Sequence, residues 1–306
     1  MTIWMDLTNS LTQHKGNVVG IVRAELLQAK YLHSLDSSIK FSILTKLGFQ
    51  EVPEKDLKWL FNSENVGMDY LKYQKNKKTL LCRLINKIRR KIEKKSFRNK
   101  RRHRDMSIPK KEFIIFPYQD GDVVYSCGWF GTNKELFFER VKSLLPNLKL
   151  VYTIYDLVMV KDDIRHFYSP VDSWFDTYLE WISNNCDALT YCGQTAQIDT
   201  EKYFKEKSWN IPKGQWLRYG GDVQISHAKH DDNFILEKLN IKKPYLLSVG
   251  SFDHKKNYRL LYQSFCLMAQ QNPQEVPNLV IVGRKLANDE LAELMLNNPL
   301  LKDKIT

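Results

Sequence analysis

The 306-residue sequence has few cysteines and no ordered arrangement of them. It contains no Cys-x-x-Cys pair and no Cys/His spacing that would assemble a tetrahedral metal site. We therefore expect neither a zinc module nor a disulfide framework, and free thiols in a reducing compartment are the simple interpretation. The five cysteines are Cys82, Cys127, Cys186, Cys192 and Cys266.

Long hydrophobic runs are also missing. The segment from Met1 to Asp6 has no basic flank followed by an apolar region, and no stretch approaches about eighteen consecutive apolar residues. We therefore expect neither a secretory signal nor a membrane-spanning helix, and we predict a cytoplasmic protein.

Signatures of several catalytic classes are absent from the sequence as well. There is no Gly-x-Ser-x-Gly elbow, no Walker A loop, no Gly-x-Gly-x-x-Gly fingerprint, and no carboxylate pair at a spacing that indicates a glycoside hydrolase. Hydrolytic mechanisms therefore gain no support.

The sequence is rich in apolar residues and in positive charge. Hydrophobic residues make up 43% of the chain, which at this length is enough for two domains with separate cores. The net charge of +12 is concentrated between Lys72 and Lys111, where 18 Lys/Arg residues stand against two acidic ones. The remainder has 29 basic and 33 acidic residues, so the basicity belongs to an inserted segment and not to the fold.

Segments rich in β-branched and aromatic residues alternate with segments of helical length, which predicts an α/β fold built from βαβ units with a mainly parallel sheet. A polar stretch from residue 220 to 232 separates two such runs. We predict an N-terminal Rossmann-like domain at 1–221, with the basic insertion at about 72–111, and a partial C-terminal domain at 222–306. The expected strands are Ile3–Leu7, Lys40–Thr45, Val123–Ser126, Leu148–Tyr155, Ala188–Tyr191, Tyr245–Val249 and Leu279–Val282. The expected helices are Gly20–Leu35, Lys134–Leu145, Val171–Asn184, Thr195–Lys205, Asn257–Gln270 and Asp289–Leu296.

The strongest local signal is a strand, a glycine and two lysines before a helix, from Leu246 to Asn257. A helix N-terminus presents unpaired N–H groups and partial positive charge, so Lys255 or Lys256 beside Gly250 would suit a phosphate or diphosphate. The alternative is that Gly250 only makes a turn and the lysines are solvated.

A second junction of this kind precedes the first long helix. Gly20 would let a ligand approach the backbone closely, and Arg23, one turn into the helix, would offer a bidentate grip on an anion. An ordinary helix start is the alternative. Two such junctions in successive α/β domains favour a ligand at the carboxyl ends of the strands, in a cleft between the domains.

A third segment is the apolar strand that ends in Tyr155 and Asp156. An acid at a strand's carboxyl end lies at the functional edge of a sheet, where Asp156 would bind sugar hydroxyls. Capping of a following helix explains the same residue equally well.

Together the three segments resemble the retaining nucleotide-sugar glycosyltransferases of family 4, also called group 1, and in particular bacterial mannosyltransferase-like members with a Gly-Ile-x-Arg loop. The resemblance runs from Asp6 to about Leu301. It implies a GT-B fold of two Rossmann-like domains and transfer of a hexose with retention, without a metal or cofactor. The donor would be a nucleoside-diphosphate sugar and the acceptor a lipid-linked saccharide or polysaccharide.

The resemblance also implies roles for individual residues. Gly20 and Arg23 match the glycine loop near the donor phosphates, and Gly250 and Lys256 match the segment whose lysine contacts the diphosphate. Tyr155 and Asp156, which the resemblance makes the candidate catalytic residues, match the family's His-Asp pair, with tyrosine in place of the histidine that lies beside the donor sugar. Ser251 stands where some members have a second cation. Further matches are Ile281-Val282-Gly283 and Arg218-Tyr219-Gly220-Gly221-Asp222.

One family motif, two glutamates eight positions apart in the second domain, does not occur in the chain. We therefore expect a C-terminally truncated second domain and little transferase activity. The last residues, Lys302 to Thr306, look like the approach to a strand that never arrives, so strand Leu279–Val282 should lack a neighbour on one side.

The basic insertion has an apolar stripe at helical spacing surrounded by cations, which suits the surface of an anionic membrane. The alternatives are a solvated insertion packed on its own domain and, as the weakest, nucleic-acid binding, for which aromatic interleaving is missing. The predicted location is therefore cytoplasmic and peripheral, at the inner membrane face. The cations assigned to membrane contact are Arg83, Lys87, Arg90, Lys91 and Lys94.

The sequence leaves three functional hypotheses. The first is the hexosyltransferase. The second is an inactive fragment or pseudoenzyme that keeps the fold and the membrane contact, and the third is a basic nucleic-acid-binding protein.

Overall fold

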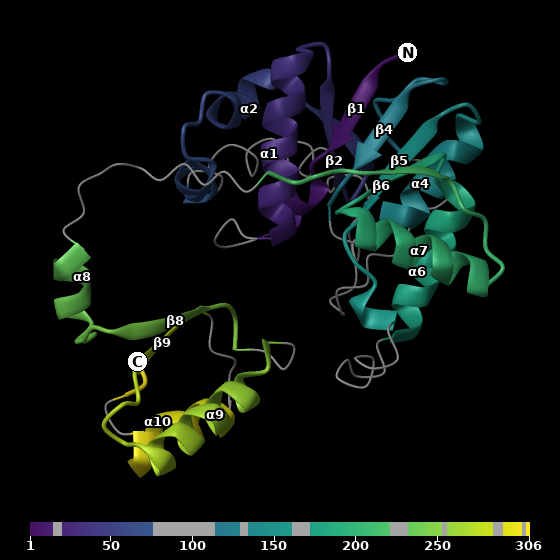
Figure 1. The fold of residues 1–306 in the computed structure, drawn as a ribbon. Coiled ribbons are helices and arrows are strands. Elements are labelled where there is room, and N and C mark those ends of the chain that lie inside the picture. Colours follow the sequence, from purple (N-terminus) through teal and green to yellow (C-terminus); the bar gives the residue numbers. More distant parts are fainter. Residues whose placement is uncertain are drawn as a thin grey trace, which may run out of the picture. The chain divides into compact units, whose positions relative to one another are not determined.

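The computed structural model describes residues 1–14, 20–75, 114–128, 134–160, 172–220, 232–252, 256–283, 290–301 and 304–306. The chain divides into two compact units, Met1–Gln224 and Ile225–Thr306 (Figure 1). Each unit contains a parallel sheet with helices, so the predicted α/β class is confirmed.

Unit 1 is built on a seven-stranded sheet in the order β3-β2-β1-β4-β5-β6-β7. All neighbouring strands are parallel except β2 and β3, which form an antiparallel pair at one edge. The strands are β1 (Ile3–Asp6), β2 (Lys40–Thr45), β3 (Gly48–Val52), β4 (Val123–Ser126), β5 (Lys149–Ile154), β6 (Ala188–Tyr191) and β7 (Lys213–Trp216).

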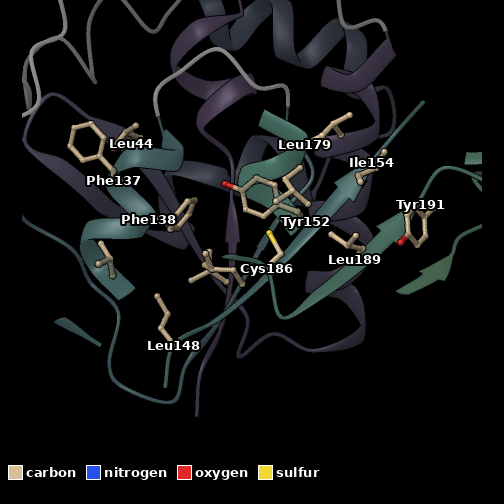
Figure 2. Close-up of a cluster of buried hydrophobic side chains, with 14 of the residues drawn as sticks. Leu44, Phe137, Phe138, Leu148, Tyr152, Ile154, Leu179, Cys186, Leu189 and Tyr191 are labelled. Carbon is tan, nitrogen blue, oxygen red and sulfur yellow. The ribbon is translucent and has the colours of Figure 1, made fainter. Parts of the chain in front are cut away.

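Helices cover the sheet of unit 1 on two faces, each with its own apolar core. One core packs β1 and β2 against α1 and α2, and the other packs β4, β5 and β6 against α4, α6 and α7. Figure 2 shows part of the second core, in which Phe138 and Tyr152 are fully buried. The helices are α1 (Gly20–Leu35), α2 (Glu54–Phe61), α4 (Lys134–Leu144), α6 (Asp172–Asn185) and α7 (Gln194–Glu206), with short turns at Asn9–Gln13 and Val158–Val160.

The chain order places a switch point between β1 and β4. From β1 the chain moves outward to β2 and β3, and it later returns to the other side of β1 to form β4. Adjacent loops at such a point leave in opposite directions, so the carboxyl ends of these two strands border the crevice where α/β proteins bind ligands.

Unit 2 has a smaller described sheet, in which β8 (Tyr245–Val249) pairs in parallel with β9 (Asn278–Val282). Its helices are α8 (Asp232–Lys238), α9 (Tyr258–Gln271) and α10 (Glu290–Asn297), followed by a short turn at Pro299–Leu301. Buried residues of α9, α10 and β9 form one core, so these helices cover the same face of the sheet.

The final residues correct one prediction from the sequence. The Leu279 N–H donates to the Lys304 carbonyl at 2.6 Å, and the Thr306 N–H donates to the Leu279 carbonyl at 2.9 Å. Residues 304–306 therefore continue the sheet beyond β9, with Ile305 in parallel register with Leu279. The expectation that strand 279–282 lacks this neighbour is wrong, because three residues suffice for pairing but are too few to show a strand pattern. In the described part of the chain, the unpaired edge belongs to β8.

Candidate functional site

A buried network of polar groups marks the switch point of unit 1. The Lys134 Nζ atom, at the first residue of α4, lies 3.1 Å from Asp6 Oδ2 and donates to Ser126 Oγ at 2.7 Å. Ser126 Oγ in turn donates to Asp6 Oδ2 at 2.9 Å. The carboxyl ends of β1 and β4 and the start of α4 are thus joined through one ion pair and two hydrogen bonds.

Asp6 also orders the backbone that follows β1. Its Oδ1 atom accepts hydrogen bonds from the N–H and the hydroxyl of Thr8, and Thr8 Oγ1 accepts from the Leu44 N–H at 2.7 Å. Both Asp6 and Lys134 are fully buried. Burial disfavours a charged lysine, but the nearby carboxylates, Asp6 above all, outweigh it and raise the pKa of Lys134. Lys134 therefore stays charged beside Asp6, and these contacts hold the two side chains in one geometry.

Glu25, in the second turn of α1, connects that helix to the turn after β1. Its Oε2 atom accepts from the Ser10 N–H at 2.7 Å, and the Ser10 carbonyl accepts from the Tyr70 hydroxyl at 2.6 Å. Burial, assisted by the neighbouring charge of Asp6, raises the pKa of Glu25 to about 8. Gly128, after β4, is closely packed, because a Cβ atom there would lie 2.5 Å from Glu25 Oε1 and 2.9 Å from Asn9 Cβ.

Asp6, Glu25 and Lys134 were not among the functional candidates predicted from the sequence. Nothing local distinguishes a lysine at a helix start or a glutamate within a helix from solvated ones. A signal was present only in Asp6, an acid that directly ends an apolar strand at the expected ligand edge.

Gly20 and Arg23 lie where the sequence predicted them, at the start of α1. Gly20 has a φ of +54°, and a Cβ atom added there would meet open space, so its backbone conformation is what favours glycine. Arg23 is exposed one turn further along. Both are thus accessible at the carboxyl-end side of β1, where α1 begins.

Tyr155 and Asp156 directly follow β5. The Tyr155 hydroxyl donates to the Cys127 carbonyl at 2.7 Å, which ties the ends of β4 and β5 together. Burial raises the pKa of Tyr155, so the phenol is a donor and not a base near neutral pH. Asp156 is exposed, and its Oδ1 atom accepts from the Val158 N–H at 3.2 Å at the start of a short 3₁₀ turn.

A small, partly open pocket of about 30 Å³ adjoins this pair on the side of α6. Tyr155 and Asp156 form its polar part, while the rest of the lining is largely apolar. The other lining residues are Gly128, Thr153, Ile154, Met159, Phe175, Tyr178 and Leu179.

Tyr155 is also connected to α1 by a chain of contacts. The Tyr155 and Tyr219 ring centroids are 6.1 Å apart, and the Tyr219 hydroxyl accepts from Gln28 Nε2 at 2.8 Å. Gln28 Oε1 accepts from the Tyr125 hydroxyl on β4. The structure therefore brings the segment after β7, the end of β5 and the helix that starts at Gly20 into one polar cluster.

In unit 2 the predicted donor-binding residues meet at the junction between β8 and α9. A Cβ atom at Gly250 would lie 3.5 Å from Lys256 Cε, and the Tyr258 hydroxyl donates to the Gly250 carbonyl at 3.2 Å. Asn257 caps α9 in a left-handed conformation, its side chain accepting from the Leu260 N–H. Lys256 is exposed directly before this cap. An exposed cation thus stands at the N-terminus of a 14-residue helix.

Gly283, after β9, approaches Gly250 more closely than any side chain would allow. A Cβ atom at Gly283 would lie 1.7 Å from the Gly250 carbonyl oxygen. Glycine is therefore required at position 283 for the segments that follow β8 and β9 to approach this closely.

The five cations assigned to membrane contact, Arg83, Lys87, Arg90, Lys91 and Lys94, lie outside the described residues. Within the described part of the chain, no helix is long and apolar enough to cross a membrane. The described residues also contain no group of three or more His, Cys, Asp or Glu side chains suited to a metal ion.

No protein-family model and no curated protein matches the chain. Among solved structures, it is similar to a mutant of S. aureus TarM in complex with Fondaparinux, alpha-GlcNAc-glycerol and UDP, at 13% identity and a TM-score of 0.37 over 60% of this chain and 32% of that one.

Two other solved structures are similar over most of the chain. One is an alpha,alpha-trehalose-phosphate synthase (UDP-forming) from Burkholderia vietnamiensis, at 11% identity and a TM-score of 0.46 over 93% of this chain and 65% of that one. The other is described as trehalose-6-phosphate from E. coli bound with UDP-2-fluoro glucose, at 10% identity and a TM-score of 0.46 over 96% and 67%. The chain thus spans about a third of TarM and about two thirds of the other two.

Proposed function

We propose that this chain is a retaining glycosyltransferase of the family 4 type, which takes a hexose, mannose being the specific candidate, from a nucleoside-diphosphate sugar. The acceptor is a lipid-linked saccharide or a polysaccharide. The observation that carries the proposal is the β8–α9 junction, where Gly250 lies against Lys256 at the start of a long helix. Exposed N–H groups, the helix dipole and a lysine together suit a diphosphate leaving group.

The residues of unit 1 support the acceptor side of this proposal. Asp156 is exposed beside a largely apolar pocket, a combination that suits a sugar hydroxyl next to a sugar ring face. Tyr155 holds the pocket wall by donating to the Cys127 carbonyl. In this scheme Asp156 binds substrate, and Tyr155 supplies shape and not proton transfer.

In this proposal, cations and helix N-termini stabilise the charge that develops on the departing nucleoside diphosphate. Lys256 and the first N–H groups of α9 act on the diphosphate, while Gly20 and Arg23 offer the same kind of contact at the start of α1. The scheme needs neither a metal nor a cofactor.

Calorimetry with UDP and GDP tests the donor site. We expect Lys256→Ala to weaken nucleoside-diphosphate binding by about 1.5–3 kcal/mol, because it removes a charge-assisted hydrogen bond. Lys242→Ala, which removes another exposed lysine of unit 2, is the matched control and should leave the affinity unchanged. Equal affinities for all three proteins would refute the donor site.

We further propose that the basic insertion attaches the protein to an anionic membrane at the inner membrane face. Its 18 cations support this, at about 1 kcal/mol for each one near the surface. Vesicle co-sedimentation that rises with anionic lipid and falls with salt is expected, and equal binding to neutral vesicles would refute the electrostatic part.

A further inference from the structure

Two acids and one lysine lie together, fully buried, at the switch point of unit 1. Asp6, Glu25 and Lys134 each have no exposed surface. If both acids were ionised, the group would carry one uncompensated negative charge away from water, an arrangement that proteins avoid. One of the two carboxyl groups must therefore hold a proton for the group to be neutral.

The hydrogen bonds show which acid remains charged. Asp6 accepts from Lys134, from the Ser126 hydroxyl and from two groups of Thr8, and this many donors favour a carboxylate. Glu25 accepts only from the Ser10 N–H through Oε2, and its buried Oε1 atom has no hydrogen-bond partner among the described residues. A charged Oε1 would be left unpaired, so the proton belongs on Glu25.

We propose that Glu25 is a positioning residue which, as the uncharged acid, ties the turn Asn9–Gln13 to helix α1. The turn is also held by Tyr70 at the Ser10 carbonyl and by Gln74 at the His14 carbonyl. Glu25 supplies the link to α1, the helix that begins at Gly20. Ionisation of Glu25 would put a second negative charge beside Asp6, and the cluster would open to water and release the turn.

Several other titratable groups surround Glu25. Burial raises the pKa of Cys127 well above its usual value and that of Tyr70 to about 12, so both stay neutral between pH 5 and about 9. Asp6 on β1 and Lys134 on α4 form the ion pair, Glu135 adjoins Lys134, and Tyr118 faces Asp6. The ring of His14 lies 6.2 Å from that of Tyr70, and we remove it as a variable with His14→Gln.

The sign of the pH effect follows from the raised pKa of Glu25. From its usual value of 4.5 up to about 8, the folded chain holds a proton that the unfolded chain has lost. Stability therefore falls as pH rises through this window and levels off above about pH 8. One proton corresponds to about a tenfold loss in the folding equilibrium constant per pH unit.

The experiment is denaturant unfolding of the whole chain at pH 5 to 9. All seven tryptophans lie in unit 1, so their fluorescence reports that unit alone. In a His14→Gln background, we expect Glu25→Gln to remove most of the decline between pH 5 and 8. Glu51→Gln, which neutralises an exposed acid on β3, should retain the decline. Equal pH slopes with and without Glu25→Gln would overturn the proposal.

Two further measurements separate a positioning role from packing alone. The measured quantity is the protection factor of a peptide containing Ser10, which compares its amide hydrogen exchange with the intrinsic rate at the same pH. This protection factor should fall above about pH 8 in the native sequence and not in Glu25→Gln. In Glu25→Ala, the protection factor of the same peptide should be lower at every pH. If Glu25→Gln does not fold, carbon-13 NMR titration of the native chain with labelled glutamate decides the matter. A carboxyl that titrates near pH 8 is expected, and titration of every glutamate below pH 6 would overturn the proposal.

Discussion

Strands β5 and β8 are similar in sequence character and differ sharply in burial. Both are short, parallel and mostly apolar, yet Leu150 on β5 is fully buried, whereas Leu247 and Val249 on β8 are 57% and 71% exposed. In unit 1, helices on both faces cover the sheet, whereas in the described part of unit 2 the helical core lies on one face.

This difference shows that an apolar run in the sequence does not by itself determine whether both faces of the strand are buried. The run indicates that its side chains favour removal from water, but the covering surface comes from elsewhere in a fold or from another molecule. For β8, both the free edge and the exposed apolar face remain without a covering element among the described residues.

The strongest test of the comparison concerns the charged centre of unit 1. Lys134→Met keeps most of the side-chain volume but leaves Asp6 buried without its cation, so we expect a loss of about 3–5 kcal/mol in unfolding free energy. Tryptophan fluorescence during denaturant unfolding measures it. Adding Asp6→Asn should recover part of the loss.

The matched control is Lys142→Ala on the same helix. Its ion pair with Asp187 is partly exposed, so a cost of about 0.2–1 kcal/mol is expected. A cost for Lys134→Met as small as that for Lys142→Ala would contradict the central role of the buried pair.

The second prediction compares the two sheets with one type of substitution. Leu150→Ala in β5 should cost about 2–5 kcal/mol, because it leaves a cavity in a packed core. Leu247→Ala in β8 should change stability by no more than about 0.5 kcal/mol. Far-UV circular dichroism during unfolding measures both. A large cost at Leu247 would show that β8 is covered in solution and would remove the contrast.

The third and smallest expected effect lies within unit 2. Gly283→Ala places a methyl group on the Gly250 carbonyl and should cost about 1–3 kcal/mol through displaced backbone. Gly250→Ala makes only ordinary contacts, the nearest at 3.5 Å, and should be nearly neutral. Hydrogen exchange of β8 and β9 peptides measures the difference, and similar protection in both variants would argue against the close approach.

The sequence predicted those elements whose pattern is local. The bounds of α1, β2, β4, β6 and β8 agree with the predicted ranges, because each has an apolar pattern bounded by polar or turn residues. It missed β7, whose residues are all exposed and which forms because β6 offers it backbone partners. It also missed β3 and α2, an edge hairpin strand and a short helix with polar outer faces.

The same distinction between local patterns and distant contacts applies to the residues of the candidate site. The position of Gly20, Gly250 and Lys256 at strand–helix junctions could be predicted, because a glycine or a lysine at such a junction is visible over a few residues. Their roles in donor binding stay predictions. The Asp6–Glu25–Lys134 group could not be predicted, because its members are far apart in the sequence and meet only through sheet topology.

The pairing of β1 with β4 also bears on how fast unit 1 folds. Ile3 is in register with Val123, so these strands meet only after the intervening chain, including the basic insertion, has closed into a loop. Doubling the length of such a loop costs only about 0.6 kcal/mol of closure entropy, whereas distant pairing slows folding strongly. We therefore expect the sheet to tolerate a long insertion at equilibrium, and its central β1–β4 pair to form after the local β2–β3 hairpin.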